Sequence, residues 1–573
     1  MAILSIVVGL CSGLAAVILK TLVHVIGRWL LTIQISSWID ANILMLALPM
    51  VGITLTVLFV KYILKGSIGH GIPAVLLSIS RKGGKLPVSG TYSSIIASTL
   101  TVAFGGSVGL EAPIVSTGSA IGSTIGRLCH LSPKQLKLTL GCGAAGAIAG
   151  IFKAPLAGIL FVVEVLMFDL SKTTAIPLLL SAISASTIAY FLMGTDVQFA
   201  FQVVEAFNLT QIPYYIVLGV VCALASVYFL RTTDKVESYF SNRSKGWQRI
   251  LYGGLLLGLL IFLFPPLFGE GYGELSQLLA GSTQSLFDRS IFAPYRQNEW
   301  AVIIMLVMLI LLKVVATATT IGSGGVGGTF GPSLIVGGLC GYAFALLVNQ
   351  LGLPTQSTAN FALVGMAGVM AGVMHAPLMA TFLIAELTGG YALMAPLLIT
   401  VVVTFMCVNP FEQHSIYARK LATKGDLLTH DKDQSAWQLM DMHKLIETNF
   451  VIVRQGDYLR DLVEAIKNSR RNLFPVLDND DRFIGVIHMD DVRHIIFTPE
   501  RYDNVYVEDL MHPLSEGDIV RTSDSLTDVV NKFRVGERYN LIVIDNQNNY
   551  IGVISRANTF SAYRRFISET SDE

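Results

Sequence analysis

Long apolar segments separated by short polar ones fill the chain from its N-terminus to about Val408. The segments 43–60, 214–230, 250–267 and 301–312 carry no charged residue. As helices, such segments are about long enough to cross or deeply enter a ~30 Å hydrocarbon core. The pattern therefore predicts a helical membrane domain with many spans.

Two features bear on how the chain sits in the membrane. The segment 1–20 is apolar but lacks a basic n-region and a clear small-residue cleavage site, so we expect a retained membrane helix rather than a signal peptide. Basic residues gather in the stretches 61–85 and 231–249, and short basic loops favour the cytoplasm. We expect these loops and the polar tail on the cytoplasmic side of a cell or inner membrane.

The tail after Val408 is rich in charge and contains a repeat. An ungapped alignment pairs the segment from Phe474 (FPVLDNDDRFIGVIH) with the segment from Leu541 (LIVIDNQNNYIGVIS). Each predicts a strand, an Asp-Asn turn and a second strand, and each follows a helical pattern. We predict a membrane domain at 1–418, a linker at 419–440, and two α/β units that share a core at 441–500 and 501–573.

The membrane domain also contains an internal repeat. An ungapped alignment pairs the segment from Gly146 (GAIAGIFKAPLAGILFVVEV) with the segment from Gly368 (GVMAGVMHAPLMATFLIAEL). A second pairs the segment from Gly105 (GGSVGLEAP) with the segment from Gly324 (GGVGGTFGP). Two related halves are typical of transporters and channels whose site lies between them.

The composition fits a protein whose solvent is the bilayer. Of 573 residues, 53% are hydrophobic and 14% are charged, whereas soluble domains carry about 25% charged residues. The 40 basic and 40 acidic residues cancel, so no overall field favours nucleic acid. The 6 cysteines show no CxxC spacing, which predicts neither a metal site nor a disulfide framework. The sequence shows no metal-ligand pair such as HExxH and no nucleophile with a base, so we do not expect an enzyme.

Three glycine-rich stretches lead into proline, at 69–75 (GHGIPAV), 109–115 (GLEAPIV) and 328–336 (GTFGPSLIV). Proline suits the first turn of a helix, and glycine lets backbone N–H groups approach a ligand closely. The N–H groups of a helix start carry about half a charge. They compensate a dehydrated anion without holding it as tightly as a full positive charge would, so the three stretches are candidate anion sites.

These residues resemble the CLC family of chloride channels and transporters. GHGIP is similar to the family signature GSGIP, GLEAP to GREGP, and GTFGP to GxFxP, and their order matches. The closing strands IGVIH and IGVIS resemble CBS motifs. The resemblance implies an all-helical CLC domain of two inverted-topology repeats, assembled as a homodimer in the lipid bilayer, with a C-terminal α/β CBS pair and no required cofactor.

The resemblance also implies the functional residues. Glu111 would be the gating glutamate, whose carboxylate occupies an anion site when ionised and withdraws when protonated or displaced. Chloride would be bound by residues from the three signatures and by a pore tyrosine, namely His70, Gly71, Ile72, Gly109, Gly328, Thr329, Phe330 and Tyr417.

Each of the polar candidates has a structural alternative. A carboxylate at position 111 would also stabilise a helix start by ~0.3–1 kcal/mol. His70 replaces the usual serine, so it either donates to the anion, with pH sensitivity near its ordinary pKa of ~6.5, or caps an interface. Tyr417 would otherwise belong to the interfacial aromatic belt.

Val165 stands where proton-coupled members carry a glutamate, and valine cannot carry a proton, which favours passive conduction. The preceding Glu164 repeats as Glu386, so we expect both to bind backbone groups at helix ends. In the tail, Asp491 lies where CBS pairs place an aspartate on a ribose, but the second unit has Asn558 there. The tail is therefore either an adenine nucleotide site or a purely structural, dimerising module.

We expect a gated chloride channel or uniporter. The first alternative is an anion/proton antiporter of the same family, or a member that prefers fluoride or nitrate. A CBS-regulated cation transporter is the alternative from another class, but such a pathway should show several membrane carboxylates, and the three glycine-proline stretches contain only Glu111.

Overall fold

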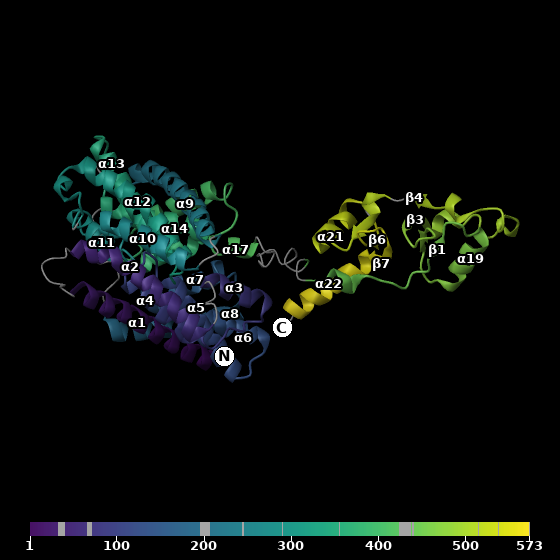
Figure 1. Cartoon of the computed structure of the whole chain (residues 1–573), viewed down its shortest axis with the longest axis horizontal. Helices are drawn as coiled ribbons and strands as arrows, with labels where there is room; N and C mark the ends of the chain where they lie inside the picture. The colour runs from purple at the N-terminus through teal and green to yellow at the C-terminus, as the bar shows by residue number, and fades with distance from the viewer. Residues whose placement is uncertain are drawn as a thin grey trace. The chain divides into compact units, whose positions relative to one another are not determined.

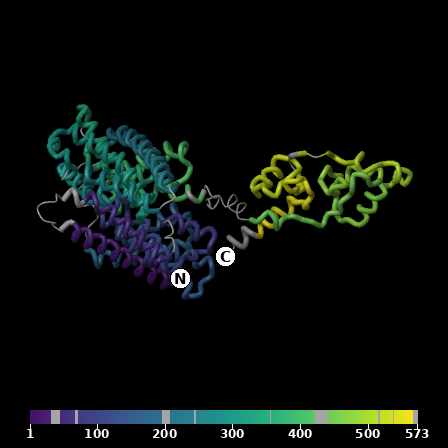
Figure 2. Tube along the Cα trace, in the orientation of Figure 1, coloured from purple at the N-terminus to yellow at the C-terminus, as the bar shows by residue number. Residues whose placement is uncertain are grey.

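The computed structural model describes residues 1–32, 41–65, 71–194, 207–242, 246–288, 290–354, 356–422, 437, 440–513, 515–536 and 538–571. The chain forms two compact units, Met1–Leu427 and Leu428–Glu573, here called the membrane unit and the tail unit. The division between them falls within the segment predicted as a linker. Figures 1 and 2 trace the chain through both units by colour.

Helices build the membrane unit, and their bounds are α1 Ala2–Thr32, α2 Ala41–Leu58, α3 Ile72–Arg81, α4 Gly90–Ala103, α5 Glu111–Leu128, α6 Pro133–Phe152, α7 Pro155–Glu164, α8 Lys172–Met193, α9 Ile212–Ser241, α10 Gly246–Leu263, α11 Tyr272–Leu279, α12 Glu299–Gly322, α13 Phe330–Gln350, α14 Thr358–Met374, α15 Pro377–Leu387, α16 Met394–Val408 and α17 Arg419–Ala422. Within the described ranges, 8 helices are long and apolar enough to cross a membrane. The first of them covers Ala2–Leu30, as expected for an N-terminal membrane helix. These helices confirm the predicted polytopic membrane domain.

The repeated sequence produces a repeated local structure at the ends of α6 and α14. Lys153 ends α6 in the left-handed region with φ 57°, and His375 ends α14 with φ 54°. In both halves the alanine-proline pair follows, and Pro155 and Pro377 each occupy the first turn of a short helix. Proline at this position costs no hydrogen bond, because the first N–H groups of a helix have no partner within it.

Glu164 and Glu386 complete these short helices across the repeat. The carboxylate of Glu164 accepts hydrogen bonds from the backbone N–H groups of Leu378 and Met379 at 3.1 and 2.7 Å. The carboxylate of Glu386 accepts from Leu156 and Ala157 at 3.0 and 2.9 Å. Each half thus caps the other, which confirms that both glutamates bind backbone groups at helix ends.

A second reciprocal contact joins the segments that precede α5 and α13. The N–H of Gly109 donates to the carbonyl of Gly328 at 2.9 Å, and the N–H of Gly328 donates to the carbonyl of Gly109 at 2.8 Å. The bridge is antiparallel, and Gly109 and Gly328 are equivalent in the repeat. A two-fold operation that reverses chain direction therefore relates the halves, as inverted repeats require. In Figure 1 the two halves, purple to blue and teal to green, lie against each other.

The tail unit contains two sheets, with strand orders β1-β2-β3-β4 and β5-β6-β7. Asp478 and Asp545 hold the two Asp-Asn turns by accepting from the backbone N–H groups two and four residues ahead. Hydrogen bonds from the backbone N–H and side chain of Asn549, and from the backbone N–H of Gln547, hold the pKa of Asp545 below its ordinary value. The element bounds are β1 Val453–Arg454, α19 Leu459–Asn468, β2 Leu473–Leu477, β3 Phe483–His488, α20 Met489–Val492, β4 His512–Pro513, β5 Ile519–Arg521, α21 Leu526–Val535, β6 Asn540–Ile544, β7 Tyr550–Ser555 and α22 Arg556–Ser571.

One apolar cluster joins the two sheets of the tail unit. It contains Phe450, Leu473 and Phe483 beside the first sheet, and Ile542 and Val553 from the second. This cluster confirms the expectation that the two α/β units share a core. Strand β4 falls in the segment predicted for the second unit, yet it pairs with β3 of the first sheet.

We predict that Glu386→Ala and Glu164→Ala destabilise the membrane unit by similar amounts. Each removes the acceptor for two backbone N–H groups, and an unsatisfied buried donor costs about 1–3 kcal/mol. Thermal unfolding of the detergent-solubilised protein measures the effect. Glu386→Gln keeps an acceptor oxygen and should lose less, and Glu299→Ala, in the first turn of α12, is the matched control. A stable Glu386→Ala variant would contradict the capping role.

Candidate anion pathway

The starts of α5 and α13 face one another because the Gly109–Gly328 bridge joins the segments that lead into them. Glu111 is the first residue of α5 and is 1% exposed. Its carboxylate Oε2 accepts a hydrogen bond from the backbone N–H of Gly331, at 3.2 Å, in the first turn of α13. A carboxylate oxygen is a small anionic group, so it marks a position where the start of α13 binds negative charge.

Two glycines make room for this carboxylate. A Cβ atom on Gly109 would lie 2.1 Å from Glu111 Oε2 and 2.9 Å from the Gly331 nitrogen. A Cβ atom on Gly331 would lie 3.2 Å from Glu111 Oε1. Glycine at these two positions therefore lets an oxygen atom, here that of Glu111, approach the backbone closely, as the sequence predicted.

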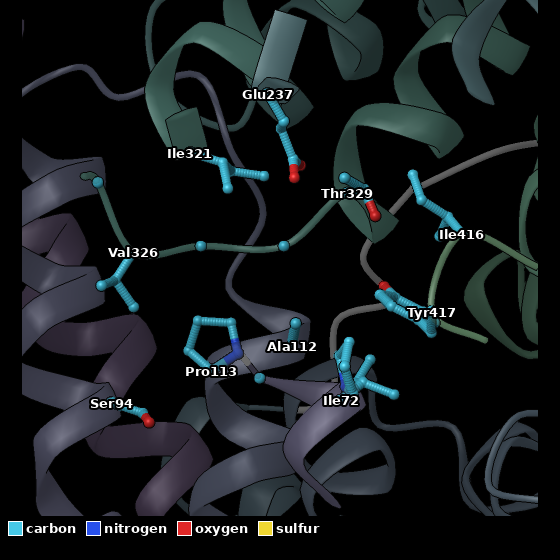
Figure 3. Close-up of a pocket in the computed structure, with 15 residues that line it drawn as sticks. Ile72, Ser94, Ala112, Pro113, Glu237, Ile321, Val326, Thr329, Ile416 and Tyr417 are labelled. Atoms are coloured by element: carbon cyan, nitrogen blue, oxygen red, sulfur yellow. The ribbon is translucent and has the colours of Figure 1, made fainter. Parts of the chain in front are cut away.

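A cavity of about 100 Å³ lies on one side of Glu111, and we call it the Tyr417 cavity. Gly71 and Ile72 at the start of α3, Gly328 and Thr329 before α13, and Tyr417 line it. Figure 3 shows the hydroxyl groups of Thr329 and Tyr417 turned toward one another, and Glu237 reaching in from α9. Both hydroxyls are buried, and a contact between them would use only one of their two hydrogens. At least one of them is therefore available to donate to an anion.

A larger cavity of about 420 Å³ lies on the other side, and we call it the Tyr272 cavity. Glu111 itself lines this cavity, whereas the next two residues, Ala112 and Pro113, line the Tyr417 cavity. Its lining also includes ionisable residues from α1 and from the segment around the start of α11, namely Lys20, His24, Arg28, Glu270, Tyr272 and Glu274. Glu111 thus lines the Tyr272 cavity, and the residues that follow it in the chain line the Tyr417 cavity.

Most of the predicted site residues meet at this place. Gly71, Ile72, Gly328, Thr329 and Tyr417 line one cavity, Glu111 lines the other, and the Gly109 backbone holds the two helix starts together. Phe330 is buried at the start of α13 and stacks on Phe152, with ring centroids 5.6 Å apart. His70 lies outside the described residues, so its two interpretations stay open.

Two of the predicted residues lie elsewhere. Val165 follows α7, is 4% exposed, and is not among the described residues that line either cavity. Asp491 in α20 accepts from His512 Nε2 at 2.8 Å, which ties α20 to β4. Nucleotide binding at Asp491 stays a prediction.

Sequence reasoning missed three polar residues at the pathway. Glu237 lines the Tyr417 cavity, Tyr272 donates its hydroxyl to Glu111 Oε1 at 2.6 Å, and Lys20 lines the Tyr272 cavity. An ionisable residue within an apolar segment generally indicates a functional site. Lys20, at the end of the apolar segment 1–20, could have been identified in this way. The glycine-rich FGEGYGEL stretch at 268–275 was a second available signal, because it separates two apolar segments.

The arrangement defines a polytopic membrane protein with two inverted halves, whose opposed helix starts flank a buried carboxylate. The family model "Voltage gated chloride channel" matches residues 52–409, and the model of the CBS domain matches residues 442–498. The chain belongs to the voltage-gated chloride channel (CLC) family.

Three comparisons illustrate the relationship. The chain is 28% identical over 356 residues to the voltage-gated ClC-type chloride channel ClcB of Escherichia coli O81, covering 61% of this chain and 80% of that protein. It resembles the crystal structure of a slow cyanobacterial Cl⁻/H⁺ antiporter, with a TM-score of 0.62, 25% identity, and coverage of 74% of this chain and 97% of that one. The fold of a eukaryotic CLC transporter matches with a TM-score of 0.64 at 18% identity, covering 97% of each chain.

We predict that Gly109→Ala lowers anion flux by roughly tenfold or more, since the methyl group would cover the Gly331 N–H and lose a donor worth about 1.5–3 kcal/mol to a charged group. Flux from proteoliposomes measures the effect. Gly390→Ala is the matched control, because a Cβ atom there would meet nothing within 4 Å. Wild-type flux through a correctly folded Gly109→Ala variant would contradict the assignment of this helix start to the pathway.

Proposed function

We propose that this protein conducts chloride passively across the membrane through a pathway gated by Glu111. The observation that carries the proposal is the Glu111 carboxylate, which lines the Tyr272 cavity and accepts from the Gly331 N–H at the start of α13, next to residues that line the Tyr417 cavity. The buried hydroxyls of Thr329 and Tyr417, which line the Tyr417 cavity, supply donors for an anion. The pathway we propose runs from one cavity to the other past this carboxylate.

The gate works by competition for the same donors. An ionised Glu111 binds the N–H that a chloride ion would need, and two negative charges in a low-dielectric site repel each other. Protonation removes the charge, weakens the hydrogen bond from Gly331, and frees the helix start for chloride. Hydroxyl and backbone donors then hold chloride weakly enough for it to leave.

Passive conduction is favoured over exchange by Val165. A buried valine has no group that takes up a proton, and exchange requires protons to reach Glu111 from the side opposite to their exit. The same proposal includes the homodimer and the cytoplasmic tail that the family resemblance implies.

The second candidate function is anion/proton exchange. The cyanobacterial structure that the chain resembles is described as a Cl⁻/H⁺ antiporter. Glu237 supports this alternative, because its side chain points into the Tyr417 cavity. Its carboxylate could take up a proton, which the valine at position 165 cannot do. Under this alternative, Glu237 would pass protons to Glu111.

We predict that chloride leaves KCl-loaded proteoliposomes, with valinomycin present, without proton uptake. Glu111→Gln imitates the protonated carboxylate and should raise efflux by roughly tenfold, since it loses a charge-assisted bond of about 1.5–3 kcal/mol. Chloride efflux and external pH are recorded together. Unchanged efflux and pH dependence in Glu111→Gln would refute the gate, and no flux of chloride, fluoride or nitrate would refute anion transport.

Glu237→Gln separates the two candidate functions. In a passive pathway this variant moves no protons, like the native chain, and loss of a negative charge from the Tyr417 cavity raises chloride efflux modestly. In an exchanger, the native chain takes up protons against their gradient and Glu237→Gln abolishes this uptake. The same liposome assay reads both quantities. Glu299→Gln, at the exposed start of α12, is the control for loss of a carboxylate.

A further inference from the structure

We propose that Tyr272 is a positioning residue that latches the Glu111 carboxylate across the pathway, and that Lys313 anchors the latch. The inference rests on the proposed gate function of Glu111 and adds a residue from another part of the chain to it. Tyr272 is the first residue of α11, and Lys313 lies in α12.

The contact between Tyr272 and Glu111 is short, and it is charge-assisted whenever Glu111 is ionised. The Tyr272 hydroxyl donates to Glu111 Oε1 at 2.6 Å, while the Gly331 N–H donates to Oε2 at 3.2 Å. The two oxygens of one carboxylate are therefore held from two elements, α11 and α13. Hydrogen bonds to an ionised group are about twice as strong as those between neutral groups. A carboxylate with both hydrogen bonds should occupy the pathway for a larger fraction of the time than a carboxylate held by the backbone N–H alone.

The latch itself is fixed from behind by a buried charge. Lys313 is 1% exposed, and its ammonium group donates to the carbonyl of Gly269 at 2.9 Å. Gly269 lies three residues before Tyr272, in the segment that lines the Tyr272 cavity. A buried ammonium group is retained only where it gains compensating contacts. Its contact with this segment explains why a lysine stands in an apolar helix.

The tyrosine hydroxyl favours the ionised form of Glu111, because a phenol donates to a carboxylate and a protonated carboxyl accepts less strongly. Without this hydroxyl, acid should open the gate at higher pH. Lys20, Glu270 and Tyr417 also act on the charge of Glu111. Further ionisable residues line the same cavity or lie behind its wall, namely His24 and Arg28 from α1, Glu274 from α11, and Lys313 from α12.

The experiment compares chloride efflux with pH for the native protein, Tyr272→Phe, Glu111→Gln and the double variant. For Tyr272→Phe we expect the midpoint of acid activation to move up by about one pH unit, as loss of one charge-assisted bond implies. In the Glu111→Gln background, Tyr272→Phe should change nothing further, because the latch acts through the carboxylate. The other ionisable groups remain in both backgrounds and cancel in this comparison.

Tyr342→Phe is the matched control, since it removes a buried hydroxyl from α13 and should leave the midpoint in place. Gly331→Ala is the second test, because its Cβ would lie 3.1 Å from the Tyr272 hydroxyl oxygen and should move the midpoint the same way. A native pH profile in Tyr272→Phe, with Glu111→Gln altered, overturns the latch and leaves the gate. An equal effect of Tyr272→Phe in both backgrounds shows action independent of Glu111, which also overturns the latch. A native profile in Glu111→Gln overturns the gate itself.

Discussion

An anion that enters the membrane interior gives up hydration, and donors fixed in the protein must replace it. In the proposed pathway these donors are backbone N–H groups at the starts of two helices, α5 and α13. Such groups are useful only if the two starts are held face to face, and the paired hydrogen bonds between Gly109 and Gly328 do this. Glycine is needed at both positions, because a Cβ on either would meet atoms closer than 3.0 Å. The cavities, the buried carboxylate and its donors are all arranged around this bridge.

The two-fold relation between the halves answers a problem that the bilayer creates. Short helices and glycine loops at membrane depth leave backbone groups without partners, and water is absent to satisfy them. Here each half supplies the partner for the other. Thr101 accepts from the Val326 N–H and Thr320 from the Ser107 N–H, in the same pairing as Glu164 with α15 and Glu386 with α7. One set of side chains, duplicated with the sequence, thereby satisfies both irregular regions.

The sequence could predict the parts of the site that lie in repeated or patterned segments. The glycine-proline stretches located Gly109, Glu111 and Thr329, and the repeat predicted that the site lies between two related halves. Glu237 and Tyr272 were not predictable in the same way. Glu237 lies in a helix of ordinary pattern, and the glycine-rich stretch around Tyr272 does not indicate what the tyrosine contacts. Only the packing of α9 and α11 against distant segments brings the two residues to the cavities. Tertiary contacts of this kind leave no periodic pattern and no fixed spacing of residues in the sequence.

The gate is the place where the two halves differ. Glu111 is equivalent to Phe330 in the repeat, and Ala112 is equivalent to Gly331. A second carboxylate at position 330 would face the first in a low-dielectric site, where like charges cannot both remain ionised. Phenylalanine instead packs on Phe152, and the missing Cβ of Gly331 leaves space for the single carboxylate on the backbone donor. The symmetric frame supplies two equivalent helix starts, and the substitutions within it give one start the carboxylate and leave the other as its binding site. The proposed gate therefore depends on a single titratable group, because only one half of the repeat carries it.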